Sequence, residues 1–454
     1  MFDKMKSILT RITADYADIR YEIKKETRIS LNGNELSEIG SNTTDGYVLR
    51  VLNKGGYASV AFTSDGDHEK AITTALENAR LMAAFTAQPV IMAKTEIIRD
   101  KYSPELNEDP RKITIDEKLA LTKHYNTLAL KHDKIATTNV QYMELIREKH
   151  FLSTEGSEIT EELVTARISG LLTSRDGNLI QNVRVAAGGS HGFGILRDRE
   201  DVFENKASIA TELLKAQPVE SGRYNAVVNQ SLGGVFTHEA FGHFSEADII
   251  ENNRSMREKM QVGAKLANDF VNITDDPTLH QQLGHYRYDD EGVPAHRTPL
   301  LAKGVLVGRL HSRRTAAAFG EPISGHCVAE DYRYAPIIRM GTIFIEPGVR
   351  TFEELLDQLG NGLYILDAKG GQTSGENFTF GAQYGYLVEN GKVAGMVRDI
   401  NISGNLYTTL QNIQAIGNDL KFSERGGCGK GQVNIRSCYG TPHLLINNLI
   451  IGGI

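Results

Sequence analysis

Alternating apolar and polar positions dominate the first 65 residues and predict long β-strands. Turn sequences separate the extended segments, notably Asn32-Gly33 and the run Asn-Lys-Gly-Gly over 53–56, which is typical of a hairpin. Apolar residues at helical spacing then predict a helix. In chain order we expect a short helix near Met5–Ile12, an extended segment over 18–33, a hairpin over 45–63 and a helix over 68–86.

A polar connector over 88–112 separates these elements from a second set. It holds three of the eleven prolines, which are poorly tolerated inside helices and central strands. Asp116 directly precedes the next helix and is placed to cap it. The second set comprises a helix over 117–132, hairpins turning at Glu155-Gly156 and Asp176-Gly177, and a helix over 201–216.

From Gly222 onward the texture of the sequence changes. A strand, a turn over 231–234 and a helix come first, followed by short strands broken by Gly, Asn and Pro. Only the segment 351–360 has a convincing helical pattern in this later part. A length of 454 residues exceeds what one hydrophobic core usually serves, so we expect at least two domains.

We therefore predict an α+β fold with an N-terminal α+β domain over 1–217 and a β-rich C-terminal domain over 218–454. Hairpins followed by a long helix occur twice in the first domain. This repetition indicates two related subdomains, about 1–95 and 112–217, although the common order of elements in α+β domains explains it equally well.

Composition narrows the function classes. The chain is 40% hydrophobic and 24% charged, with a net charge of -7 and scattered basic residues, so no nucleic-acid partner is expected. No apolar run has the length of a signal peptide or a membrane span, which predicts no membrane association. Cys327, Cys428 and Cys438 are too few for a disulfide framework, so we expect a cytoplasmic, reduced protein.

The segment GGVFTHEAFGH carries the main candidate chemistry. His238-Glu239 and His243 are one residue too widely spaced for the H-E-x-x-H zinc signature. Five steps of about 100° turn the two rings about 140° apart on a straight α-helix. A π-bulge would bring them together, and we expect Gly242 to tolerate that distortion. Spacing alone leaves two readings open, a metal site and a helix with two incidental histidines.

The segment FTHEAFGH resembles the H-E-A-x-G-H helix of the TldD/PmbA family, also known as modulators of DNA gyrase. The segments YDDEGVPAHRTPLLAKGVLVGRL, YRYAPIIRMGTIFIEPG and ERGGCGKGQ are similar to further motifs of that family, and the resemblance covers most of the chain. Because the histidine motif is present, the resemblance implies a TldD-type zinc metallopeptidase. It also implies a homodimer, or a heterodimer with a PmbA/TldE-type paralogue that lacks the motif.

A catalytic zinc site needs a third protein ligand, with one position left open for water. The resemblance implies that Cys428 is this ligand. The surrounding glycines would let the backbone approach an ion, and Lys430 would favour the thiolate. Cys327, which has His326 and Glu330 as neighbours, is the main rival, and Cys438 ranks below Cys428.

Glu239 is the expected general base, since it adjoins a ligand without having to occupy a coordination position. Glu246 either orients an imidazole or is a solvated helix residue. Arg339 would clamp substrate or hold a structural ion pair, and the run 289–292 reads as a turn with solvated carboxylates rather than a calcium loop. His311, His326 and His443 are expected to be satisfied surface or core histidines.

The sequence thus predicts a zinc-dependent peptidase with broad specificity for unfolded or extended peptides. Such peptides would bind as an added strand along an exposed sheet edge. Two alternatives belong to other classes: a non-catalytic dimer subunit or scaffold, and a regulator of DNA gyrase. The intact histidine-glutamate-histidine set favours the enzyme.

Overall fold

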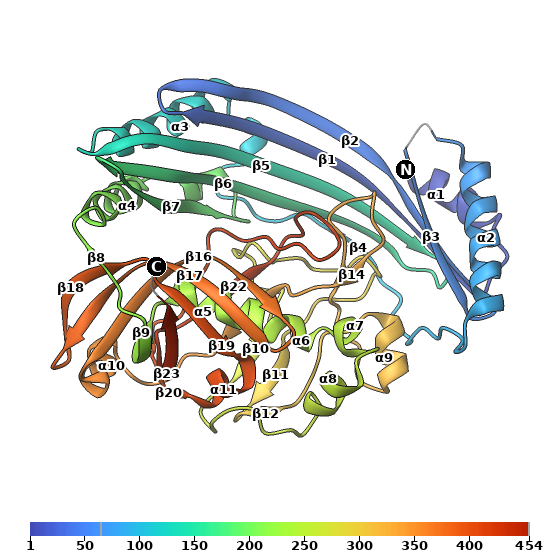
Figure 1. The fold of residues 1–454 in the computed structure, drawn as a ribbon. Helices are drawn as coiled ribbons and strands as arrows, with labels where there is room; N and C mark the ends of the chain where they lie inside the picture. Colours follow the sequence, from blue (N-terminus) through green and yellow to red (C-terminus); the bar gives the residue numbers. More distant parts are fainter. Residues whose placement is uncertain (64–65, 453–454) are drawn as a thin grey trace.

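The computed structural model describes residues 1–63 and 66–452. A long curved sheet, here called the arch, lies over a second layer of shorter strands and helices (Figure 1). The arch has the strand order β3-β2-β1-β5-β6-β4, and β7 also pairs with β6. Its strands are β1 (Tyr16–Asn32), β2 (Glu35–Asn53), β3 (Gly56–Thr63), β4 (Arg99–Tyr102), β5 (Ile135–Ser153), β6 (Glu158–Asp176) and β7 (Leu179–Gly189).

Two three-stranded meanders, each followed by a helix, build the arch. The strands β1, β2 and β3 precede α2 (His68–Phe85), and β5, β6 and β7 precede α4 (Glu200–Glu212). Antiparallel pairing of β1 with β5 joins the two meanders into one continuous sheet. The helices α1 (Phe2–Leu9) and α3 (Ile115–Leu130) complete this layer, and the expected hairpin turn places Lys54 and Gly55 at positive φ.

Two details of the connector differ from expectation. Part of the polar segment 88–112 forms β4, which pairs in parallel with β6, so an existing strand edge overrides its weak local preference. Thr114 rather than Asp116 caps α3, because the Thr114 side chain accepts the hydrogen bond from the Glu117 N–H. Asp116 lies within the first turn, where a carboxylate still favours the helix dipole.

Two larger sheets form most of the second layer, which also has a two-stranded sheet of β13 (Cys327–Val328) and β14 (Ile337–Ile338). One has eight strands in the order β16-β9-β23-β19-β17-β18-β8, with β20 also paired to β23, and the other has the order β12-β11-β10-β15-β22-β21. The first sheet uses β8 (Gln217–Pro218), β9 (Gly222–Val228), β16 (Gly362–Ser374), β17 (Asn377–Glu389), β18 (Lys392–Arg398), β19 (Asn401–Asn405), β20 (Ile413–Ile416) and β23 (Leu444–Gly452). The second uses β10 (Ile273–Asp275), β11 (Thr298–Ala302), β12 (Val305–Leu306), β15 (Thr342–Ile345), β21 (Lys421–Phe422) and β22 (Cys438–Thr441).

The helix with the histidine motif packs between these two sheets. It consists of α5 (Gln230–Phe236), a π-helical segment (Thr237–Gly242) and α6 (His243–Ser245), and it contacts β16 on one side and β22 on the other. Its apolar side chains join the largest hydrophobic core of the described residues, together with side chains from both sheets. A rigid apolar surround therefore holds the motif in place.

The turn expected at 231–234 is helical instead, because α5 already begins at Gln230 after the Asn229 cap. Gly233 and Gly234 allow close packing here: a Cβ at Gly233 would lie 2.5 Å from the Thr441 Cγ2, and one at Gly234 would lie 2.7 Å from the Tyr439 Cδ2. The expected helix over 351–360 is present as α10 (Phe352–Leu359), with a capping box. The short helices α7 (Ala247–Ile250), α8 (Arg254–Lys259), α9 (Arg313–Phe319) and α11 (Leu406–Gln411) were not predicted, since each is too short to show a helical period.

Buried ion pairs join the arch to the second layer. Arg50 contacts Glu291 at 3.1 Å, while Asp290 contacts Arg20 at 3.2 Å and Lys149 at 3.1 Å. These five residues, here called the interlayer network, are each at most 5% exposed. The prediction of solvated carboxylates at 289–292 is therefore wrong. Their partners come from β1, β2 and β5, which are distant in the sequence, so the local sequence pattern could not predict these contacts.

The fold as a whole is a strand-rich, mixed α+β arrangement. Among residues 1–63 and 66–452, no helix combines the length and the apolar character needed to cross a membrane.

Candidate metal centre

The predicted widening of the motif helix is present. Residues Thr237–Gly242 form a π-helical turn, and the His243 N–H donates its hydrogen bond to the carbonyl of His238, five residues earlier. The wider turn places the two imidazoles on one side of the helix, with ring centroids 5.3 Å apart and the planes at 86°. The extra residue in the spacing is thus absorbed by the backbone.

Gly242 contributes through packing rather than through backbone freedom. Its φ of -58° and ψ of -47° are ordinary helical values. A Cβ at this position would lie 2.1 Å from the Met340 Sδ and 3.1 Å from the Ile343 Cδ1. The turn therefore does not draw on the tolerance expected of Gly242, and the constraint at this position is the close approach of β15 and the segment before it.

Four candidate side chains converge at this turn. Possible ligand atoms of His238, Glu239, His243 and Cys428 all lie within 4.8 Å of one another, and this is the one such group of His, Cys and acidic residues in the described chain. The His243 Nε2 lies 3.6 Å from the Cys428 Sγ and 3.5 Å from the Glu239 Oε2. The structure therefore brings together all four residues that the sequence singled out. We refer to them as the four-residue cluster.

A glycine-rich loop presents Cys428 to the two imidazoles. Gly426 and Gly427 have φ values of 52° and 82°, which an L-residue rarely adopts, and they turn the chain toward the motif helix. Cys428 and Ile435 then exchange two backbone hydrogen bonds of 3.0 Å. These bonds close the loop and fix the position of the thiol.

The three cysteines differ sharply in acidity. Burial raises the pKa of the Cys428 thiol, but His238 and His243 beside it outweigh this effect and lower the pKa to about 5. Burial raises the pKa of Cys438 to about 12, and that of Cys327 also lies well above its ordinary value. The rival Cys327 is fully enclosed beside acidic groups and lies outside the four-residue cluster.

His238 supplies a direct test of whether a cation fits here. Its side chain is only 1% exposed, and neither ring nitrogen has a hydrogen-bond partner among the described residues. Leaving a buried polar group unpaired costs about 1–3 kcal/mol. A metal ion bound by one imidazole nitrogen would remove much of that penalty, and two imidazoles with a thiolate are donors that zinc prefers. The residues present therefore fit zinc.

Glu246 forms a hydrogen bond with His243 on the side of the ring away from Cys428. It is fully buried, and its Oε2 lies 3.2 Å from the His243 Nδ1 and 2.9 Å from the Lys430 Nζ. Burial raises the pKa of Glu246, but Lys430 and the hydrogen bond from His243 lower it to about 2. The solvated alternative for Glu246 is therefore wrong. Lys430 itself binds Glu246 and Asp248 rather than the thiol, contrary to its expected role.

Arg339 is a member of the site that the sequence indicated only weakly. It is 0% exposed and lies 3.7 Å from the Glu246 Oε1. Burial lowers the pKa of its guanidinium, but Glu246 and Cys428 outweigh this effect and raise the pKa above its ordinary value. Arg339 is therefore a cation that faces both groups. Its three side-chain nitrogens lack a hydrogen-bond partner within the part of the chain that is described.

His311, His326 and His443 are satisfied, as expected. His326 binds the Asp275 carboxylate at 3.0 Å, and His311 binds Glu321 at 3.0 Å. His443 binds Asp419 at 2.6 Å. The second ring nitrogen of each is also engaged, by Ser324, Thr315 and Tyr364 respectively, so no nitrogen is left to bind a metal.

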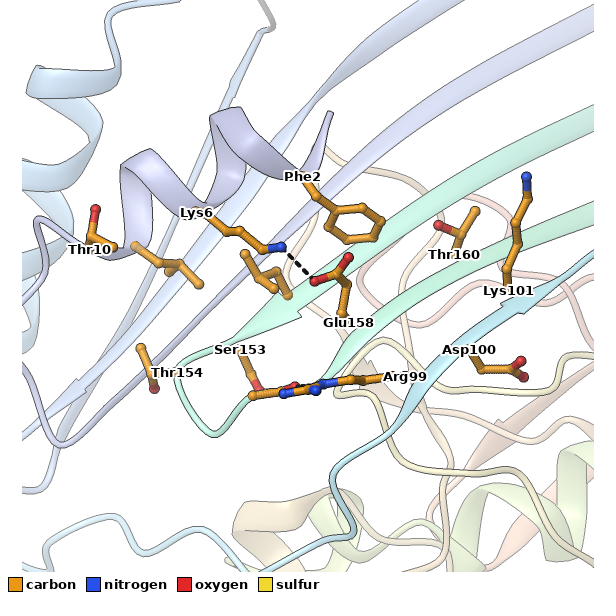
Figure 2. A pocket seen from close by; sticks show the side chains of 13 residues that line it. Phe2, Lys6, Thr10, Arg99, Asp100, Lys101, Ser153, Thr154, Glu158 and Thr160 are labelled. Carbon is orange, nitrogen blue, oxygen red and sulfur yellow. Dashed lines mark hydrogen bonds and ion pairs between the residues drawn. The ribbon is translucent and has the colours of Figure 1, made fainter.

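A large cavity lies elsewhere. It has a volume of about 1020 Å³ and opens between α1 and the strands β4, β5 and β6 (Figure 2). Lys6 and Glu158 form an ion pair of 2.9 Å across it. Neither histidine nor cysteine lines this cavity, so it offers no soft metal ligand and no nucleophile comparable to those of the four-residue cluster.

Three profiles of one protein family match separate parts of the chain. The profile described as the PmbA/TldA metallopeptidase C-terminal domain matches residues 221–453, which is more than half of the chain. Those for domain 1 and the central domain match residues 17–83 and 108–217. The chain belongs to the PmbA/TldD metallopeptidase family.

Relatives of this chain carry peptidase names. A metalloprotease of Synechocystis is 34% identical over 443 residues, which cover 97% of this chain and 95% of that protein. A zinc metalloprotease TldD homologue of Saccharolobus solfataricus is 28% identical over 447 residues, covering 97% of each chain. The chain is accordingly a metallopeptidase of the PmbA/TldD family.

Solved structures share the fold over its full length. TldE from Thermococcus kodakarensis has a TM-score of 0.80 at 19% identity, with 100% of both chains covered. A Thermotoga maritima protein, named as a modulator of a DNA gyrase, has a TM-score of 0.83 at 22% identity, again with 100% of both chains covered. At these identities the likeness concerns the fold alone.

Proposed function

We propose that this PmbA/TldD family member is a zinc-dependent peptidase in which His238, His243 and Cys428 hold the metal and Glu239 is the general base. The observation that carries the proposal is the convergence of four candidate ligand atoms within 4.8 Å at a π-helical turn. Three protein ligands of this kind form a catalytic site, since they leave a coordination position open.

Zinc held there would polarise the scissile carbonyl and lower the pKa of water toward about 7. Glu239 would take a proton from the attacking water and pass it to the leaving amine. Its charge state suits a base: burial raises its pKa, but hydrogen bonding to His243 and the nearby imidazole of His238 lower it below its ordinary value. Glu239 therefore carries a negative charge at neutral pH.

The supporting groups orient the ligands. Glu246 accepts a hydrogen bond from the His243 Nδ1, which leaves the Nε2 facing Cys428 and the centre of the cluster. Lys430 holds Glu246 in place from the cysteine loop. Arg339 offsets the negative charge of Glu246 and of the thiolate, so the buried site does not accumulate anions.

The proposed substrates are unfolded or extended peptides, cleaved with broad specificity. The short strand β21 ends the six-stranded sheet and lies beside Tyr439, whose ring contacts that of His238. A peptide added along such an edge would bind through main-chain hydrogen bonds, which are insensitive to side-chain identity. Folded proteins cannot present an extended segment in this way.

A paired assembly is also proposed, either a homodimer or a heterodimer with a PmbA/TldE-type paralogue. The full-length likeness to TldE supports a paralogue of the same shape. The scaffold alternative is disfavoured by the intact cluster, and the charge and motifs give no support to binding of DNA gyrase. The three free cysteines support the expected cytoplasmic location.

Elemental analysis of the purified protein tests the proposal. The wild type is expected to hold about one zinc per chain, and Cys428→Ala to hold almost none, because two imidazoles alone bind zinc weakly. Cys438→Ala, which removes a thiol outside the cluster, is the matched control and should keep its zinc. Equal zinc in wild type and Cys428→Ala would exclude Cys428 as a ligand.

A further inference from the structure

A cleft of about 310 Å³ opens between the arch and the second layer, next to the metal centre. Arg184 of β7 and Lys206 of α4 line it from the arch. Lys421 of β21, Arg425 of the cysteine loop and Tyr439 of β22 line it from the other side. Strands distant in the sequence therefore contribute to a single recess.

Tyr439 connects this cleft to the four-residue cluster. Its ring lines the cleft, and its centroid lies 5.5 Å from that of His238, with the planes at 65°. Arg425 stands three residues before Cys428 in the same loop. A peptide cleaved at the cluster would therefore have a neighbouring residue, or its own terminus, in reach of the cleft.

The cleft has more positive than negative charge available. Its two acids are already engaged, since Asp367 pairs with Lys206 and Glu424 pairs with Arg199. In the described part of the chain, no carboxylate lies within ion-pair distance of Arg184, Lys421 or Arg425. We call these three residues the cation cleft.

Two arginines of the arch lie near Arg425: Arg184 lines the same cleft, and Arg167 of β6 lies outside its lining. Arg167 donates a hydrogen bond to the backbone carbonyl of Arg425, which ties the cysteine loop to β6. Burial lowers the pKa of both Arg167 and Arg184, and the like charge of Arg425 lowers each of them further. Arg184 and Arg425 are half-buried and have no carboxylate partner among the described residues, so an anion between them would be attracted by both.

We propose that the cation cleft is a substrate subsite that anchors a carboxylate of the peptide, either an Asp or Glu side chain or the C-terminal carboxylate. Arg184 and Arg425 would bind it, since a guanidinium matches a carboxylate in a bidentate fork, and Lys421 would add long-range attraction. This inference rests on the proposed peptidase function. It adds a preference for one charged position to an otherwise sequence-tolerant groove.

A panel of fluorogenic peptides tests the subsite. A neutral peptide, its variants with one Glu at each position in turn, and the same peptide with a free or amidated C-terminus separate the two sources of carboxylate. We expect one carboxylate position to raise kcat/KM by about tenfold or more, as charge-assisted hydrogen bonds do. In Arg184→Gln and Arg425→Gln, the carboxylate peptide and the neutral peptide should have the same kcat/KM. Arg80→Gln, which removes an exposed charge from α2, should preserve it.

A binding measurement distinguishes failure of the subsite from failure of the proposed function. In a Glu239→Gln background, fluorescence anisotropy of the same labelled peptides reports affinity without turnover. Tighter binding of the carboxylate peptide, weakened about tenfold by Arg425→Gln, supports the subsite even if the wild type cleaves nothing. Two results would overturn the subsite. One is wild-type cleavage with equal kcat/KM for all peptides; the other is equal affinity of Glu239→Gln, with and without Arg425→Gln, for the carboxylate peptide.

Discussion

Two charged regions of this molecule both contain fully buried side chains but differ in how the polar atoms of those side chains are satisfied. In the interlayer network, Asp290 and Glu291 each face cations of the arch at about 3 Å. In the four-residue cluster, His238 is equally buried, but both of its ring nitrogens lack a partner among the described residues. In the network every charged group has an opposite charge within the chain, whereas His238 has no hydrogen-bond partner on either ring nitrogen.

The difference indicates what each region does. Charges paired within the chain stabilise one arrangement of its parts and leave nothing for a ligand to bind. Unpaired buried donors are costly to the fold and are kept where function requires them. The run 289–292 has the composition of an acidic metal loop, but its residues Asp290 and Glu291 join the two layers instead.

The largest effect is expected from a variant that removes the proposed general base and keeps the proposed metal ligands. Glu239→Gln should lower kcat for peptide cleavage by about 10²–10⁴-fold, because general base catalysis contributes a factor of this size. Zinc content and Tm should stay at wild-type values, since Glu239 is not a proposed ligand. A variant that keeps wild-type kcat would show that another group takes the proton.

The second prediction concerns the stability that the interlayer network contributes. Asp290→Asn removes a buried counter-charge that Arg20 and Lys149 share, although Glu22 and Glu161 remain nearby, and should reduce the free energy of unfolding by about 3 kcal/mol. Asp133→Asn, at an exposed position, is the control and should change it by less than about 0.5 kcal/mol. Denaturant unfolding measures both. A small loss for Asp290→Asn would mean that the network contributes little to stability.

The third experiment alters the surround of the metal and not its ligands. Glu246→Gln removes the charge that orients His243 and should weaken zinc affinity by about 10–100-fold, as outer partners of a ligating histidine do. Competition with a zinc-binding dye measures the affinity, and the exposed Glu35→Gln is the control. Unchanged affinity would make Glu246 a purely structural residue.

The smallest expected effect is a pH dependence. Burial raises the pKa of Asp290, but Arg20 and Lys149 hold it well below its ordinary value. The stability from this carboxylate is therefore present above its unfolded pKa of about 4 and is lost as the pH falls below it. Between pH 4 and pH 3, the wild type should lose up to about 1.4 kcal/mol more unfolding free energy than Asp290→Asn. Parallel curves would contradict this assignment.

Much of the fold follows from local pattern. The alternation over 18–33 and 45–63, the turn at 53–56 and the helix over 68–86 reappear in β1, β2, β3 and α2, because burial of one face and turn chemistry act over a few residues. The same holds for the π-helical turn, since the spacing of His238 and His243 poses a geometric problem with few solutions.

Other features could not be read from the sequence because they depend on residues far along the chain. Gly233, Gly234 and Gly242 look like turn or distortion signals, but they exist to let β22 and the segment near Met340 come close. The burial of 289–292 depends on cations of the arch. The cation cleft likewise combines Arg184 with Arg425, which are 241 positions apart and carry no common motif.

The interlayer network limits how this enzyme can be dissected. A fragment that begins after residue 217 would keep every atom of the motif helix and the cysteine loop, yet it would expose Asp290 and Glu291 without the cations that normally cover them. The complementary fragment would expose Arg20, Arg50 and Lys149 without their partners Asp290 and Glu291. The smallest piece of this protein able to hydrolyse a peptide therefore has to include the arch, even though no proposed ligand or base lies within it.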